Sequence, residues 1–206
     1  ENWIYTKINN LIKIIKKKKH NVKKINIHQN IQKCDILFII GYHYIVPLKY
    51  LKLSNAPLVI HESNLPKGRG WSPMTWDILN KKNQIYFTLF RANEKIDTGD
   101  IYIQKIIKLK GTELYDEIKK IQYCNTEKIL LEFIYKYPKI LNNRKSQKGK
   151  ASYYKRRLPI NSKVLFNNKL SEIFNLLRIS SYKDYPVHFS HKGKKFKLKL
   201  EHYEKK

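Results

Sequence analysis

The 206-residue chain is long enough for one sizeable domain, with or without a small appendage, and two independent cores would be crowded. No apolar run approaches the roughly 20 residues that span a bilayer, and the two cysteines lack the spacing of a zinc site or a disulfide framework. The formal net charge of +27 fits a nucleic-acid partner or drift toward residues with A/T-rich codons. We favour drift, because no recognised nucleic-acid-binding motif accompanies the charge. We therefore expect a cytoplasmic protein with reduced thiols and no membrane segment.

The first part of the chain predicts a helix and two buried strands. Asn2 can cap a helix whose apolar residues recur at helical spacing before the lysine run at 16–19. Continuous apolar runs at 35–40 and 57–61 are typical of parallel strands that are covered on both faces. We expect a loop and a short crossover helix between these strands, at 41–53.

The middle of the chain predicts a short helix, two strands and two further helices. A polar turn separates the strands, Thr112 and Thr126 can cap the two helices, and Pro138 can close the second. The short helix and the strands are expected at 75–79, 84–90 and 101–109.

The last third of the chain is richer in predicted loops than the rest. The segment 142–150 is charged and without periodicity, so it is a candidate linker between a domain at 1–141 and an appendage at 142–206. The appendage predicts a short helix carrying Leu170, Ile173, Phe174 and Leu177, followed by a half-buried strand at 196–200. Its alternating strand would allow a homodimer, although nothing in the sequence selects one.

Two polar segments follow predicted strands. His61 opens "HESNLPKGRGWSP" at the end of the second apolar run, and Asp97 lies in the turn "IDTGD". Ligands of open α/β sheets bind beyond the carboxyl ends of the strands. A histidine after a strand is more often structural, and Asp-Thr-Gly-Asp alone is an ordinary turn. Two adjacent strand ends would nevertheless bring His61 and Asp97 together.

Together these segments resemble the folate-dependent formyltransferases, the family of methionyl-tRNA formyltransferase, whose signature is His-x-Ser-x-Leu-Pro, Arg-Gly, a later proline and an Asp-x-Gly loop. The stretches "GRGWSPMTW", "ELYDEI", "YYKRRLP" and "FNLLRI" are similar to the branch that formylates amino groups of nucleotide-linked sugars in polysaccharide biosynthesis. The resemblance implies an α/β, Rossmann-like domain with a mostly parallel sheet and a short α+β appendage at the C-terminus. It also implies a first strand, which is missing before Glu1, so we expect the sequence to begin inside a longer protein.

The reaction implied by the resemblance assigns roles to named residues. A neutral sugar amine attacks the formyl carbon of 10-formyltetrahydrofolate, and no metal is required. Protonated His61 can donate to the developing oxyanion, and Asp97 can receive the amine proton. Val59 occupies the position of an asparagine that helps to hold the oxyanion elsewhere in the family, so Asn64 is a candidate replacement.

Two sets of binding residues complete this prediction. The folate slot is expected to comprise Gly41, Tyr42, Ile45, Phe90, Ile96 and Asp97. The nucleotide-linked amino sugar is expected to contact Ser63, Lys67, Arg69, Gly70, Trp71, Ser72, Trp76, Arg156 and Arg157.

Two other functions stay open. A methionyl-tRNA formyltransferase would give the charge of +27 a use, but the tail is too short for the separate nucleic-acid-binding barrel expected there. A non-catalytic RNA-binding module or a pseudo-enzyme remnant would be consistent with Val59 and with the missing strand.

Overall fold

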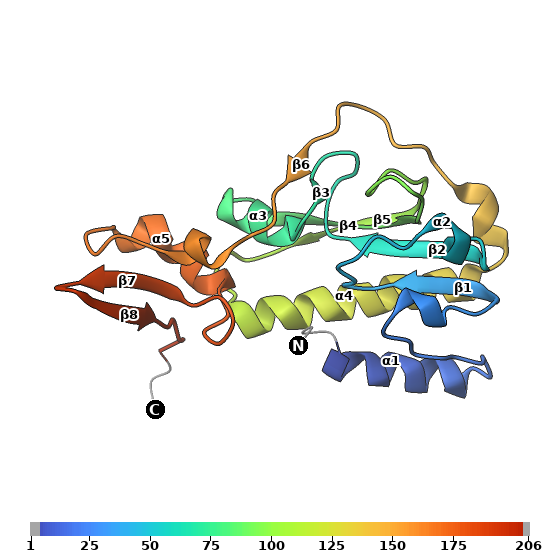
Figure 1. Cartoon of the computed structure of the whole chain (residues 1–206), viewed down its shortest axis with the longest axis horizontal. Helices are drawn as coiled ribbons and strands as arrows, with labels where there is room; N and C mark the ends of the chain where they lie inside the picture. The colour runs from blue at the N-terminus through green and yellow to red at the C-terminus, as the bar shows by residue number, and fades with distance from the viewer. Residues whose placement is uncertain (1–4, 204–206) are drawn as a thin grey trace.

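A four-stranded sheet with the order β1-β2-β4-β5 organises the first two thirds of the chain (Figure 1). We describe residues 5–203 from a computed structural model, so the predicted cap at Asn2 lies outside the described residues. The strands of this sheet are β1 (Cys34–Ile39), β2 (Ser54–His61), β4 (Gln84–Arg91) and β5 (Ile101–Lys108).

The pairing within this sheet is mixed. β1 and β2 are parallel, and the short helix α2 (Leu48–Leu51) lies in their crossover, as expected. β2 and β4 are antiparallel, and so are β4 and β5. The segment 92–100 is too short for the dozen or more residues of a parallel crossover, so β5 turns back beside β4. The α/β class is confirmed, whereas the expectation of a mostly parallel sheet is corrected for these two pairs.

One long helix, α4 (Tyr115–Lys136), takes the place of the two helices predicted after residue 111. Thr126 lies inside α4 and is 2% exposed, so it is a packing residue and not a cap. Glu117 caps the first turn instead, because its Oε2 accepts the Leu114 N–H at 2.8 Å. The prediction of two helices was wrong because no glycine or proline interrupts this stretch.

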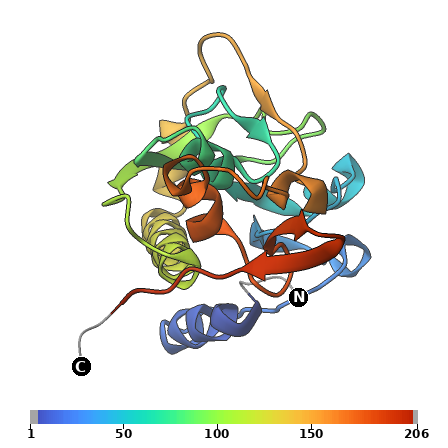
Figure 2. The same ribbon diagram turned by 90° about the vertical axis from the view of Figure 1, so that its left-hand side faces the viewer.

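Two helices cover one side of the sheet. α4 packs on β4, and α1 (Tyr5–Lys17) packs against α4 (Figures 1 and 2). Phe87 of β4 and Phe133 of α4 are both fully buried in this core, and Leu11 of α1 belongs to the same cluster. The apolar runs of β2 and β4 are thereby withdrawn from water, and the polar loops remain at the strand ends.

The C-terminal part of the chain packs against the loop after β2 and against two helices. It contains β6 (Tyr153–Tyr154), which pairs with β3 (Arg69–Gly70), and α5 (Leu170–Ile179), which packs on α4 and α3 (Pro73–Leu79). The predicted C-terminal strand is β8 (Lys194–Leu198), the antiparallel partner of β7 (Val187–His191). The remaining elements are the 3₁₀ turns η1 (His28–Asn30), η2 (Lys139–Asn143) and η3 (Pro159–Ser162).

A buried ion pair ties this part to the rest. The Arg178 side chain of α5 is 0% exposed, and its Nη1 lies 3.4 Å from Glu113 Oε2. Burial raises the pKa of the Glu113 carboxyl, but hydrogen bonds from the Lys110 and Gly111 backbone N–H groups and the charge of Arg178 outweigh it, so this pKa lies below its ordinary value. The domain boundary at 141/142 stays a prediction. Among residues 5–203, no helix has the length and apolar character needed to cross a membrane.

Candidate active site

His61 closes β2 and is held in one orientation. It is 8% exposed, and its Nε2–H donates to the Gly68 carbonyl at 2.9 Å. The backbone after it is fixed from the neighbouring strand, because the Thr88 hydroxyl of β4 donates to the Ser63 carbonyl at 2.6 Å. The imidazole therefore presents a proton at a defined atom.

Asp97 approaches His61 from the loop between β4 and β5. Its Oδ2 lies 3.6 Å from His61 Nε2 and accepts the Gly70 N–H at 2.8 Å. Asp97 has a φ of 52°, a left-handed conformation that aspartate tolerates better than most residues. The two side chains, 36 positions apart in the sequence, thus meet at one place, as the sequence analysis expected.

The loop of Asp97 depends on two neighbours. A Cβ atom at Gly99 would lie 1.7 Å from the Arg91 carbonyl oxygen, so only glycine fits there. Gln147 Nε2 donates to the carbonyls of Asp97 and Gly99, both at 2.9 Å, and its Oε1 accepts from Arg69 Nη2 at 2.7 Å. Sequence reasoning missed Gln147, because it lies in the aperiodic segment assigned as a linker. The loop is thus positioned by a residue from the C-terminal part of the chain.

His61 and Asp97 line a cleft of about 1120 Å³. The same cleft is lined by Gly41, Tyr42, Ile45, Phe90 and Ile96, the residues expected to hold folate. Gly70, Trp71, Ser72, Arg156 and Arg157, expected to bind the sugar nucleotide, also line it. Val59, which points to the same face of β2 as His61, contributes an apolar wall. The structure thus gathers twelve of the seventeen predicted site residues around one cavity.

Trp71 is the aromatic platform of this cleft. It stacks on the His43 ring at 5.8 Å between centroids and 18° between planes, and the Arg156 guanidinium lies 4.9 Å from the Trp71 centroid. Arg157 Nη2 donates to Ser162 Oγ at 3.0 Å, and burial lowers the Arg157 pKa. Its Nε is buried and has no hydrogen-bond partner among the described residues. These groups form an aromatic and cationic end of the cleft.

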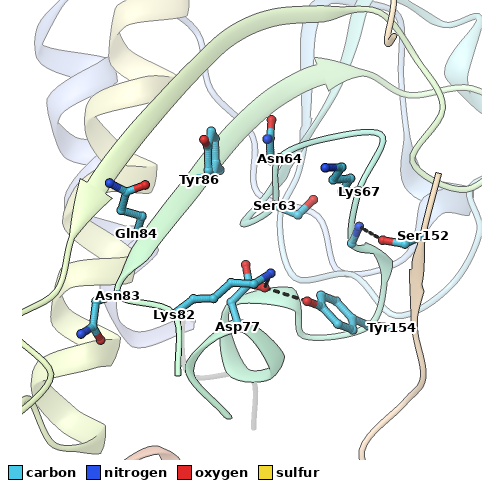
Figure 3. Close-up of a pocket in the computed structure, with 11 residues that line it drawn as sticks. Ser63, Asn64, Lys67, Asp77, Lys82, Asn83, Gln84, Tyr86, Ser152 and Tyr154 are labelled. Atoms are coloured by element: carbon cyan, nitrogen blue, oxygen red, sulfur yellow. Dashed lines mark hydrogen bonds and ion pairs between the residues drawn. The ribbon is translucent and has the colours of Figure 1, made fainter. Parts of the chain in front are cut away.

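Five predicted residues lie elsewhere. Ser63, Asn64 and Lys67 line a separate cavity that shares no lining residue with the cleft (Figure 3). Arg69 contacts Gln147 and the Tyr153 hydroxyl, and the Trp76 Nε1–H donates to the Lys155 carbonyl at 2.9 Å. Arg69 and Trp76 therefore hold the segment 147–155 against the loop after β2 and against α3. Asn64 lines this separate cavity and not the cleft of His61, so its role at the oxyanion stays a prediction.

Helix α4 adds a polar chain that sequence reasoning did not identify. Gln122 Nε2 donates to Glu62 Oε1 at 2.7 Å, and Lys119 Nζ donates to Gln122 Oε1 at 2.9 Å. All three residues line the cleft. Burial lowers the pKa of Lys119, whereas the charge of Glu62 opposes that shift. The only sequence signal for these hydrogen-bonded side chains was the position of Glu62 next to His61.

The fold and the cleft define an α/β protein in which a histidine at the end of β2 and an aspartate from the loop 92–100 lie side by side in one cavity. A family model described as formyl transferase matches residues 9–134, so the chain belongs to the formyl transferase family. This confirms the family expected from the motifs at 61–73 and 96–100. No three His, Cys, Asp or Glu side chains of residues 5–203 are grouped so as to hold a metal ion.

The comparisons include proteins of both branches. GDP-perosamine N-formyltransferase of Brucella melitensis is 30% identical over 130 residues, covering 61% of this chain and 48% of the relative. The structure of methionyl-tRNA formyltransferase from Clostridium thermocellum superposes with a TM-score of 0.74 and 20% identity, covering 99% of this chain and 90% of that one. WlaRD, a sugar 3N-formyl transferase whose crystal structure was obtained with dTDP and 5-N-formyl-THF, gives 0.64 and 25%, covering 86% and 65%. The chain spans about half or less of the length of the curated relatives it matches.

Proposed function

We propose that the protein transfers a formyl group from 10-formyltetrahydrofolate to the amino group of a nucleotide-linked amino sugar, in cell-surface polysaccharide biosynthesis. The observation that carries the proposal is the pair of His61 Nε2 and Asp97 Oδ2, 3.6 Å apart in a cleft of about 1120 Å³. A proton donor and a proton acceptor at this distance can act on the two atoms that change charge in formyl transfer.

The cleft is suited to a flat, largely apolar donor. Tyr44, Ile45 and Ile96 line it and are 72%, 60% and 52% exposed in the free protein. Side chains of this kind gain from being covered by an aromatic ring system. The bound donor would supply an electrophilic formyl carbon and leave as tetrahydrofolate.

The residues of this chain have separate tasks in the transfer. His61 Nε2–H donates to the Gly68 carbonyl in the free protein, and a rotation of the ring would exchange that acceptor for the formyl oxygen as that oxygen gains negative charge. Asp97 Oδ2 accepts a proton from the attacking amine as the new C–N bond forms, directly or through water. The same proton can then pass to the nitrogen released from the old C–N bond, so the enzyme ends unchanged. Gly70 keeps Asp97 in place through its N–H.

The sugar nucleotide is assigned to the end of the cleft at Trp71. A nucleoside base can pack against the aromatic side chains at this end, and Arg156 and Arg157 can face the phosphates. Two comparisons support this substrate class, namely GDP-perosamine N-formyltransferase and the sugar 3N-formyl transferase obtained with dTDP. Methionyl-tRNA is the second candidate, favoured by the likeness to methionyl-tRNA formyltransferase and by the charge of +27.

One experiment separates these candidates. The purified protein is incubated with 10-formyltetrahydrofolate and either a panel of nucleotide-linked amino sugars or methionyl-tRNA, and products are examined by mass spectrometry for one added formyl group. We expect transfer to a sugar, and its loss in His61→Ala and Asp97→Asn. Transfer to methionyl-tRNA alone would reassign the substrate. Absence of transfer to every acceptor, together with salt-sensitive RNA binding, would favour a non-catalytic RNA-binding protein.

A further inference from the structure

A second cavity, of about 460 Å³, lies beside the catalytic loop and is separate from the cleft (Figure 3). The loop after β2 forms one wall through Ser63, Asn64 and Lys67, and the start of β4 forms another through Gln84 and Tyr86. Three residues that were predicted to contact the sugar or the oxyanion therefore line this cavity and not the cleft of His61. Their presence here needs a different explanation.

The floor of the cavity is built around a buried carboxylate. Asp77 is 6% exposed, and its Oδ1 accepts from Lys82 Nζ at 2.8 Å and from the Tyr154 hydroxyl at 2.7 Å. The hydrogen bond to Asp77 is the main cause that raises the pKa of Lys82, so this ammonium group keeps its proton at neutral pH. Asp77 and Lys82 offset each other, and Lys67 adds a further positive charge to the lining.

One polar atom of the cavity is left without a partner. Ser63 is 1% exposed, and its Oγ is buried with no hydrogen-bond partner among the described residues. In Figure 3 this hydroxyl faces the side of the cavity where Lys67 and Ser152 lie. A buried hydroxyl is unfavourable unless a ligand or water completes its hydrogen bond. A polar group that reached Ser63 would therefore add a hydrogen bond that the free protein lacks.

The lining also restricts the chemistry of the ligand. Apart from Gly68, it consists of charged, amide, hydroxyl and phenol side chains, with no aliphatic residue. Amides such as Asn64 and Asn83 suit hydroxyl groups, and lysine ammonium groups bind phosphate as point charges. The volume is in the range of cavities that hold small organic molecules and is far larger than an inorganic ion needs.

We propose that this cavity binds a hydroxylated phosphate monoester, with its phosphate between Lys67 and Lys82 and its hydroxyl groups on Ser63 and the neighbouring amides. In Figure 3 the amino ends of Lys67 and Lys82 extend into the cavity from opposite sides. The site is distinct from the cleft, and its ligand does not have to take part in formyl transfer.

Glycerol 3-phosphate is a suitable probe, because it is a small, stable molecule that carries a phosphate monoester and neighbouring hydroxyl groups. It is titrated into the full chain at about 0.15 M salt, which screens the general attraction of a basic protein for anions. The side-chain amide resonances of Asn64, Asn83 and Gln84 are followed by NMR. We expect saturable shifts at these amides and none at the Trp71 indole.

Matched variants identify the cations. Lys67→Gln is expected to weaken binding about tenfold, since it removes a charge-assisted hydrogen bond. Lys52→Gln makes the same charge change at an exposed site outside both cavities and is expected to leave binding unchanged. Ser63→Ala is expected to weaken binding by a smaller factor. Asp97→Asn should keep the affinity of wild type, so a failure of the proposed formyl transfer would not affect this result.

Three results would overturn the proposal. The first is an absence of saturable amide shifts with glycerol 3-phosphate. The second is equal affinity in Lys67→Gln and Lys52→Gln, which would reduce the effect to overall charge. The third is binding of gluconate, a hydroxylated carboxylate, as tight as that of the phosphate probe, which would exclude a site built for phosphate.

Discussion

Asp97→Asn tests whether the carboxylate at the cleft acts as a base or only holds the loop. The substitution keeps the size of the side chain and removes its charge. An amide oxygen can still accept the Gly70 N–H, now as a neutral hydrogen bond in place of a charge-assisted one. Asparagine also tolerates the left-handed φ of 52° at this position, so the backbone is not strained.

The expected effects on stability and on catalysis differ in size. Exchange of a charge-assisted hydrogen bond for a neutral one lowers the free energy of unfolding by about 1 kcal/mol, a small part of the 5–15 kcal/mol typical of a domain. Loss of a positioned general base costs roughly 100-fold to 10,000-fold in rate, and 1,000-fold corresponds to about 4 kcal/mol of transition-state stabilisation. The variant should therefore be folded and nearly inactive.

The assay is the initial rate of formyl transfer at saturating donor, measured together with urea unfolding of the same preparations. His61→Ala is the matched partner, since its side chain lies 3.6 Å away. Because the two residues act in one step, the double variant should lose little more activity than the more damaging single variant. Transfer by Asp97→Asn within threefold of wild type would refute the base role. Fully additive losses would refute joint action in one step.

Four further predictions follow from particular contacts. Gly99→Ala should lower the free energy of unfolding by about 3 kcal/mol, because the added Cβ would overlap the Arg91 carbonyl. Gly149→Ala adds a Cβ with nothing within 4 Å and should lower the free energy of unfolding by only about 1 kcal/mol, through backbone strain. Urea unfolding compares the two variants. Glu113→Gln should be less stable than wild type at pH 7, and this difference should vanish as the pH falls through the lowered pKa, below 4.5, because the charged carboxylate contributes its stability above that range. Arg156→Met should raise KM for the sugar nucleotide about tenfold with little change in kcat, since its charge is proposed to face the phosphates, which do not react. Val59→Asn should increase kcat several-fold, because an amide donor would then stand on the His61 face of β2; a decrease with an unchanged unfolding curve would contradict this.

The sequence by itself determined the parts of the protein that depend on local pattern. The apolar runs at 35–40 and 57–61 correctly predicted the two parallel strands, because a continuous apolar stretch of this length is typical of a strand that is covered on both faces. The sequence also predicted that His61 and Asp97 meet, but the structure corrects the reason. β2 and β4 are antiparallel, with Leu58 opposite Arg91, so their carboxyl ends point in opposite directions, and it is the loop at 92–100 that brings Asp97 to His61.

Tertiary structure decided which way each loop residue faces. The two ends of the segment 61–73 line the cleft and its middle lines the second cavity, and nothing in the order of the residues assigns Trp71 to one and Lys67 to the other. The direction of each side chain depends on contacts between distant parts of the chain. Two examples are the hydrogen bond from the Gly68 N–H to Ser152 Oγ and the one from Gln147 Nε2 to the Asp97 carbonyl. A loop without repeating backbone hydrogen bonds takes its shape from such distant partners, and their positions are fixed only when the whole chain is folded.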